Sequence, residues 1–175
     1  MKKRTLIEAI KKRAAVVAVG PSTARGQGVA GVVGRLRTAL DAVPLSKFST
    51  SKQMHFSRAL DASTKKVMAA LPPRARSWGL ARKCLNIFLR DCFYNGYLRG
   101  AYRLGAAEPW YEVPLDRAVA DGLKTHFKRK LPRWPGVKRV TPEISEPYQE
   151  AALLLSRSWG ISRVHLDTFL WVDGR

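Results

Sequence analysis

Two residues of this chain combine a reactive side chain with a position near the start of a predicted helix. Lys83 lies in SWGLARKCLN, in the first turns of one helix, and Asp116 lies in EVPLDRAVADGLK, where it opens the following helix. The positive end of a helix and the neighbouring Arg82 favour the neutral, nucleophilic form of a lysine amine. An aspartate can accept the proton of that amine or stabilise positive charge that develops on a sugar. The pair is therefore a candidate for nucleophilic catalysis.

Both residues also have a purely structural interpretation. Lys83 can be a solvated surface lysine. Asp116 can be a helix N-cap, because an aspartate at a helix start accepts a backbone N–H bond and faces the positive end of the helix dipole. The sequence alone leaves the catalytic and the structural interpretations open.

Other catalytic and metal-binding patterns are absent from the sequence. It contains no GxxxxGK[ST], no HExxH and no acidic cluster of the DxD type, and its histidines are scattered. Cys84 and Cys92 lie too far apart on one predicted helix to form a disulfide, so we expect buried free thiols. Neither a metal nor another cofactor is expected.

The charge of the chain indicates a polyanionic partner. Lys and Arg number 32 against 13 Asp and Glu, which gives a formal net charge of +19. The basic residues are spread over several segments, and such a dispersed excess is typical of proteins that bind nucleic acid, because neutralised phosphates release counterions. We expect duplex DNA, with RNA open. Acidic proteins and anionic membrane surfaces are the alternatives.

The helical spacing of apolar residues predicts an all-α protein. We expect one domain over residues 1–175, in which lobes over about 1–72 and 73–175 are possible. No stretch approaches 18 apolar residues, and charges interrupt the first segment where a signal peptide would be apolar, so we expect an intracellular, cytoplasmic monomer. The predicted helices cover residues 3–18, 32–42, 52–60, 63–70, a long segment capped by Ser77, about 115–128, and two segments that begin near Thr141 and Ser162. Asp61 or Ser63 is the expected N-cap of the helix over 63–70, and the apolar stripe of the segment capped by Ser77 predicts the central core helix.

A resemblance to a known family rests on several of these features together. A glycine-containing turn, a lysine that opens a helix and a VPLD motif that opens the following helix resemble the helix-hairpin-helix DNA glycosylase superfamily. The separation of Lys83 from Asp116 is similar to that in the archaeal 8-oxoguanine glycosylase branch. That family also has an acid and a tryptophan one turn apart on a C-terminal helix, and Asp167 and Trp171 match this spacing. The resemblance covers roughly residues 70–175.

Membership of this family would imply a two-lobed helical bundle that flips a modified purine into the cleft between its lobes. Lys83 would attack C1′ of the sugar with the help of Asp116, and AP lyase cleavage could follow. Asp167 and Trp171 would line the base pocket. The expected contacts to DNA phosphates are basic residues of two segments, Arg74, Arg76, Arg82, Lys128, Arg129 and Lys130. The alternative is a noncatalytic, helix-hairpin-helix-like nucleic-acid-binding protein in which Lys83 and Asp116 are structural.

Overall fold

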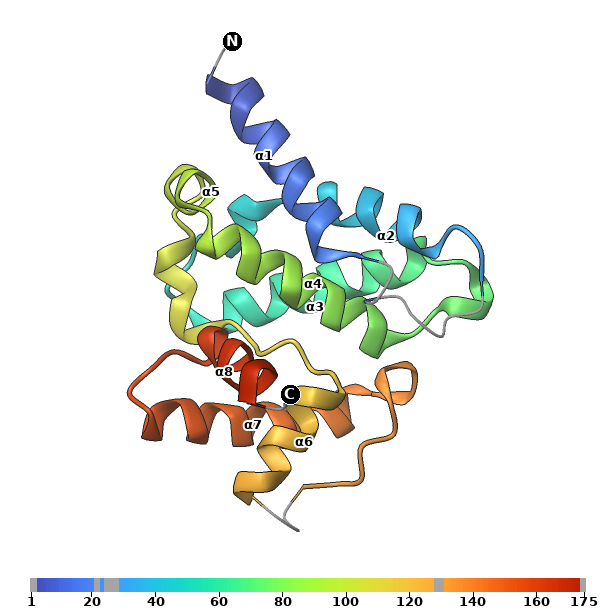
Figure 1. Cartoon of the computed structure of the whole chain (residues 1–175). Coiled ribbons are helices and arrows are strands. Elements are labelled where there is room, and N and C mark those ends of the chain that lie inside the picture. Colours follow the sequence, from blue (N-terminus) through green and yellow to red (C-terminus); the bar gives the residue numbers. More distant parts are fainter. Residues whose placement is uncertain (1–2, 21–22, 24–28, 128–130, 174–175) are drawn as a thin grey trace.

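The computed structural model describes residues 3–20, 23, 29–127 and 131–173, and the side chains of 3, 4 and 171–173 lie outside this description (Figure 1). All regular secondary structure among the described residues is helical, which confirms the predicted all-α class. The α-helices are α1 (Lys3–Ala18), α2 (Val32–Asp41), α3 (Gln53–Ala70), α4 (Trp78–Tyr94), α5 (Gly96–Ala101), α6 (Arg117–Phe127), α7 (Pro142–Ser158) and α8 (Leu166–Asp173). Short 3-10 helices connect them: η1 (Leu45–Phe48), η2 (Pro73–Ala75), η3 (Leu104–Trp110), η5 (Val137–Arg139) and η6 (Arg163–His165).

Residues 53–70 form one continuous helix, so the prediction of two short helices in this region was wrong. The segment contains neither Gly nor Pro that would interrupt it. Either Asp61 or Ser63 was the expected N-cap of the second helix. Ser63 is instead buried within α3, and Asp61 forms an ion pair with Arg82 of α4.

α4 is the central helix, as predicted from its apolar stripe. Ser77 is its N-cap and accepts a hydrogen bond from the backbone N–H of Leu80 at 3.2 Å. Its side chains are buried on several faces, because α1, α3 and η5 all pack against it. Cys84 and Cys92 are free and buried within α4, as predicted, and burial raises the pKa of the Cys84 thiol to about 12.

The buried apolar side chains form two separate clusters. The first extends from α1 to Tyr111 and also includes Val164, and the second extends from Val113 to Leu170. We call these parts the N-terminal lobe (residues 3–111) and the C-terminal lobe (residues 113–173). Figure 1 shows α6, α7 and α8 gathered on one side of α4. The two clusters of buried apolar side chains therefore meet near residue 112.

Gly79 allows the first turn of α4 to lie directly against η5. A Cβ atom at this position would lie 2.2 Å from the carbonyl oxygen of Val137 and 2.8 Å from the Cβ of Val140. The hydroxyl of Ser77 also donates a hydrogen bond to the carbonyl oxygen of Lys138 at 3.0 Å. The chain around η5 therefore covers the start of α4, and only a glycine fits at position 79.

We expect Gly79→Ala to lower the free energy of unfolding by about 2 kcal/mol, because a backbone carbonyl cannot rotate away from the added methyl group. Gly34→Ala is the matched control, since no atom lies within 4 Å of its added Cβ and the position is inside α2. This variant should gain about 0.5–1 kcal/mol from the higher helix propensity of alanine. Chemical denaturation measures both. A Gly79→Ala variant as stable as the parent would contradict the close contact.

Candidate active site

Lys83 and Asp116 lie together at the boundary between the two lobes. The Nζ of Lys83, on α4, is 3.4 Å from Oδ2 of Asp116, which directly precedes α6. The Lys83 side chain is 13% exposed and that of Asp116 is 27% exposed. The predicted pair therefore forms, and it is partly shielded from solvent.

Asp116 uses its two carboxylate oxygens for two different contacts. Oδ1 accepts a hydrogen bond from the backbone N–H of Val119 at 3.1 Å, which is the N-cap contact expected from the sequence. Oδ2 forms the ion pair with Lys83. The structural and the catalytic interpretations of Asp116 are thus compatible, because each concerns a different oxygen.

The segment before Asp116, residues 110–115, is held by side chains from the C-terminal part of the chain. Gln149 of α7 accepts a hydrogen bond from the backbone N–H of Val113 at 3.1 Å and donates one to its carbonyl oxygen at 2.8 Å. Arg163 of η6 donates to the carbonyl oxygens of Tyr111 at 2.8 Å and Trp110 at 3.2 Å. These contacts fix the path of the chain that leads to Asp116.

Glu112, in the middle of this segment, forms a buried ion pair with Arg82. The guanidinium donates to both carboxylate oxygens of Glu112 at 2.8 Å, and it also donates to Asp61 at 2.8 Å and Thr64 at 2.9 Å. Burial alone would raise the pKa of Glu112, but the hydrogen bonds and charge of Arg82 outweigh it and hold this pKa below the usual 4.5. Arg82 therefore joins α4, α3 and the segment before Asp116.

The position of Arg82 corrects one expectation. Arg82 was expected to contact DNA phosphates, but its side chain is buried and its charge is balanced by two carboxylates. Arg74 and Arg76 are exposed, although Arg76 also donates to the carbonyl oxygens of Leu71 and Ala69 at the end of α3. Both remain candidates for phosphate contact. The other three candidates, Lys128, Arg129 and Lys130, lie outside the described residues.

Asp167, at the start of α8, is buried and forms an ion pair with Arg90 of α4. Burial raises the pKa of this carboxyl, Arg90 opposes the increase, and the charge of Asp116 adds to it, so the two aspartates lie within electrostatic reach of each other. Oδ1 of Asp167 is buried without a hydrogen-bond partner. Trp171 belongs to α8, but its side chain lies outside the description, so its role in a base pocket stays a prediction.

A small cavity adjoins Lys83 between the lobes. It has a volume of about 10 Å³ and is lined in part by Trp78, Lys83 and Asn86 of α4 and by Leu115 and Gln149. This volume is about the minimum needed for one water molecule. The cavity does not admit a nucleobase in this conformation.

Sequence reasoning missed the residues that position Asp116. Glu112 stands in the same short stretch as Asp116, and a buried carboxylate needs a cation, but nothing local identifies Arg82 as its partner. Gln149 and Arg163 act on backbone atoms far away in the sequence, and neither belongs to a recognisable motif.

The fold and the site define an all-helical, strongly basic chain with a lysine–aspartate pair between two lobes. Comparison with known protein families, with curated proteins and with solved structures found no match. Within the described ranges, none of the helices has the length and apolar character needed to cross a membrane. The same ranges hold no group of three His, Cys, Asp or Glu side chains arranged to bind a metal ion.

We expect Glu112→Gln to destabilise the protein by about 3 kcal/mol at pH 7, because it removes one partner of a buried ion pair. The pKa of Glu112 is lowered in the folded state, so its stabilising contribution is present above about pH 4.5 and is lost as the pH falls through the folded-state value. The difference in unfolding free energy between the parent and the variant should therefore shrink below pH 4.5. Urea denaturation over a pH series measures this, and a difference that does not change with pH would contradict it.

Proposed function

We propose that this protein is a base-excision DNA glycosylase that removes a modified purine through an imine formed at Lys83. The observation that carries the proposal is the 3.4 Å contact between the Lys83 amine and the Asp116 carboxylate at the lobe boundary. A nucleophile within reach of a base is the arrangement that covalent catalysis needs. The net charge of +19 supports DNA as the partner.

The proposed reaction begins with a proton transfer from the Lys83 ammonium to Asp116. The free amine then forms a bond to C1′ of the sugar while the bond from C1′ to the purine nitrogen breaks, and the purine leaves with a proton. Opening of the sugar ring gives the imine. Loss of a C2′ proton, with departure of the 3′ phosphate, would complete the lyase step. Asp116 gives the proton that it accepted to the leaving purine, and the carboxylate that is restored is suited to stabilise the positive charge that develops at C1′.

The N-cap contact of Asp116 supports a fixed orientation of its carboxylate. The hydrogen bond at Oδ1 anchors the side chain to α6, so Oδ2 stays directed toward Lys83. Because the adjoining cavity measures about 10 Å³, a flipped base requires the lobes to separate around Lys83. The unpartnered Oδ1 of Asp167 is a candidate acceptor for the entering base.

A second candidate function is noncatalytic binding of nucleic acid. The small volume of the cavity beside Lys83 favours it, because an ion pair that merely fastens α4 to the C-terminal lobe needs no space for a substrate. In this alternative the lysine and the aspartate are structural, and the basic surface alone carries the function.

Borohydride trapping distinguishes the two functions. With duplexes that contain modified purines, the parent protein should give a stable covalent adduct, because borohydride reduces the imine. Lys83→Gln should give no adduct while binding of unmodified duplex is retained, since one positive charge among many is lost. Lys12→Gln, an exposed lysine on α1, is the matched control and should trap like the parent. Failure of the parent to trap on any modified duplex would favour the noncatalytic function.

Asp116→Asn separates the charge of Asp116 from its cap. Asparagine caps helices about as well as aspartate, so the contact to Val119 and the helical fold should be preserved. Base excision should fall at least about 100-fold, because the substitution removes both the proton acceptor and the negative charge that stabilises C1′. Single-turnover excision kinetics measure the loss. Excision at the parent rate would reduce Asp116 to a helix cap.

A further inference from the structure

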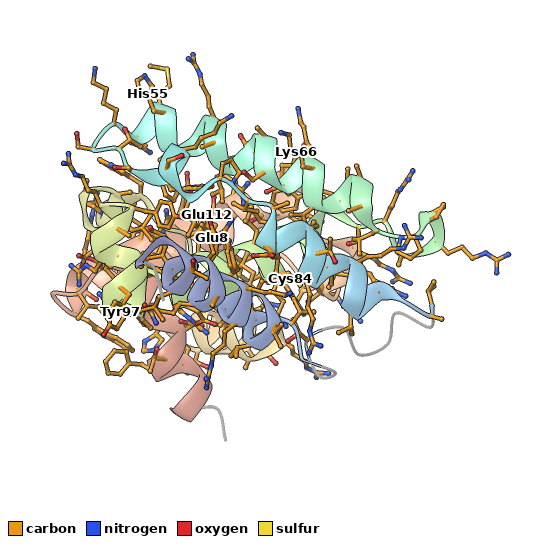
Figure 2. The ribbon with its side chains drawn as sticks, turned by 90° about the horizontal axis from the view of Figure 1, so that it is seen from above. Glu8, His55, Lys66, Cys84, Tyr97 and Glu112 are labelled. Atoms are coloured by element: carbon orange, nitrogen blue, oxygen red, sulfur yellow. The ribbon has the colours of Figure 1, made fainter. Side chains whose placement is uncertain are left out.

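A second basic feature lies on the N-terminal lobe, away from the lysine–aspartate pair. An open hollow of about 350 Å³ runs between η1 and α3, and its lining shares no residue with the cavity beside Lys83. We call it the α3 groove. Its lining residues are Pro44, Lys47, His55, Arg58, Ala59, Ala62, Ser63 and Lys66. Figure 2 shows His55 and Lys66 along the same helix, at the upper edge of the molecule in that view.

The lining of the α3 groove is basic and contains no acid. Lys47, Arg58 and Lys66 are exposed, as is His55. The single acidic residue in the sequence of α3 is Asp61, and it pairs with Arg82 at 2.8 Å. The one carboxylate on α3 is thus engaged by Arg82 and is not among the residues that line the groove.

The floor of the groove is made of small residues. Ala59, Ala62 and Ser63 lie at helical spacing between the long side chains of Arg58 and Lys66. Short side chains at these positions let a bulky group approach the surface of α3 closely. The flanking side chains of Arg58 and Lys66 are long enough to reach the negative charges of such a group from both sides.

The spacing of the basic residues matches a polymer better than a single small anion. Arg58 and Lys66 are separated by about 12 Å along the helix axis, at 1.5 Å per residue. Along the axis of duplex DNA, where each strand carries one phosphate per 3.4 Å or so, this distance spans about three to four phosphates of one strand. Lys47 approaches from η1 on the other wall of the hollow. A membrane surface would instead require large apolar anchors, and the lining has none.

We propose that the α3 groove binds the sugar–phosphate backbone of duplex DNA as a second contact, separate from the site at Lys83. This inference rests on the proposed function only because both have DNA as the partner. It requires no catalysis at Lys83. Arg58, Lys66 and Lys47 contact phosphates, and the small residues between them form the surface on which the backbone lies. The contact is independent of sequence, because phosphates carry no base information.

The test is the salt dependence of binding to an unmodified duplex. Each phosphate contact contributes a slope of about −0.9 to log K against log salt, so Arg58→Gln with Lys66→Gln should make the slope shallower by about 1.8. Lys12→Gln with Arg13→Gln removes the same two residue types from the exposed side of α1 and should leave the slope unchanged within error. Arg58→Lys with Lys66→Arg keeps both charges and should bind like the parent. Circular dichroism confirms that each variant remains helical.

The possible outcomes separate this inference from the proposed enzyme. A shallower slope for the groove variant alone supports the α3 groove, even if no modified duplex is ever trapped at Lys83. Equal changes of the salt slope in the groove variant and the α1 variant would mean that basic residues contribute to binding wherever they lie on the surface, and would overturn the proposal. An unchanged slope for the groove variant would also overturn it. So would a variant that loses binding to phosphatidylserine vesicles and keeps its binding to DNA.

Discussion

The arrangement of the candidate site depends on one buried cation that must be neutralised. An arginine removed from water is costly unless carboxylates pair with it, and Arg82 sits inside the N-terminal lobe. Glu112 accepts hydrogen bonds from Nε and Nη2 of its guanidinium, and Asp61 accepts one from Nη1. The pair thereby anchors the point at which the chain passes from one lobe to the other. Asp116 lies four residues further along the chain, so the Arg82–Glu112 ion pair also fixes its position.

Adjacent residues of α4 have opposite environments because of helix geometry. Arg82 and Lys83 are about 100° apart around the helix axis. Arg82 therefore points toward α3 and the chain at Glu112, whereas Lys83 points toward the start of α6. The basic pair in the sequence is thus divided into a structural cation and a candidate nucleophile, and one helix supplies both.

The parts of the structure that depend on local chemistry could be predicted from the sequence. The N-caps at Ser77, Asp116 and Thr141 are all present, because a cap requires only a side chain and the backbone two or three residues later. The burial of Arg82 could not be predicted, since its partners lie 21 and 30 residues away. The continuity of α3 was missed for the same reason: Asp61 resembles a cap until its distant partner is known.

The tight seating of η5 on Gly79 and the small cavity beside Lys83 belong to the same interface between α4 and the C-terminal lobe. If the protein acts as the proposed glycosylase and must open there to accept an extrahelical base, the open form is a minor population at rest. The measured affinity for substrate is then the intrinsic affinity multiplied by the open fraction. Variants with a looser interface would bind substrate more tightly and melt at a lower temperature, so that natural selection would have to balance stability against substrate affinity at a single surface.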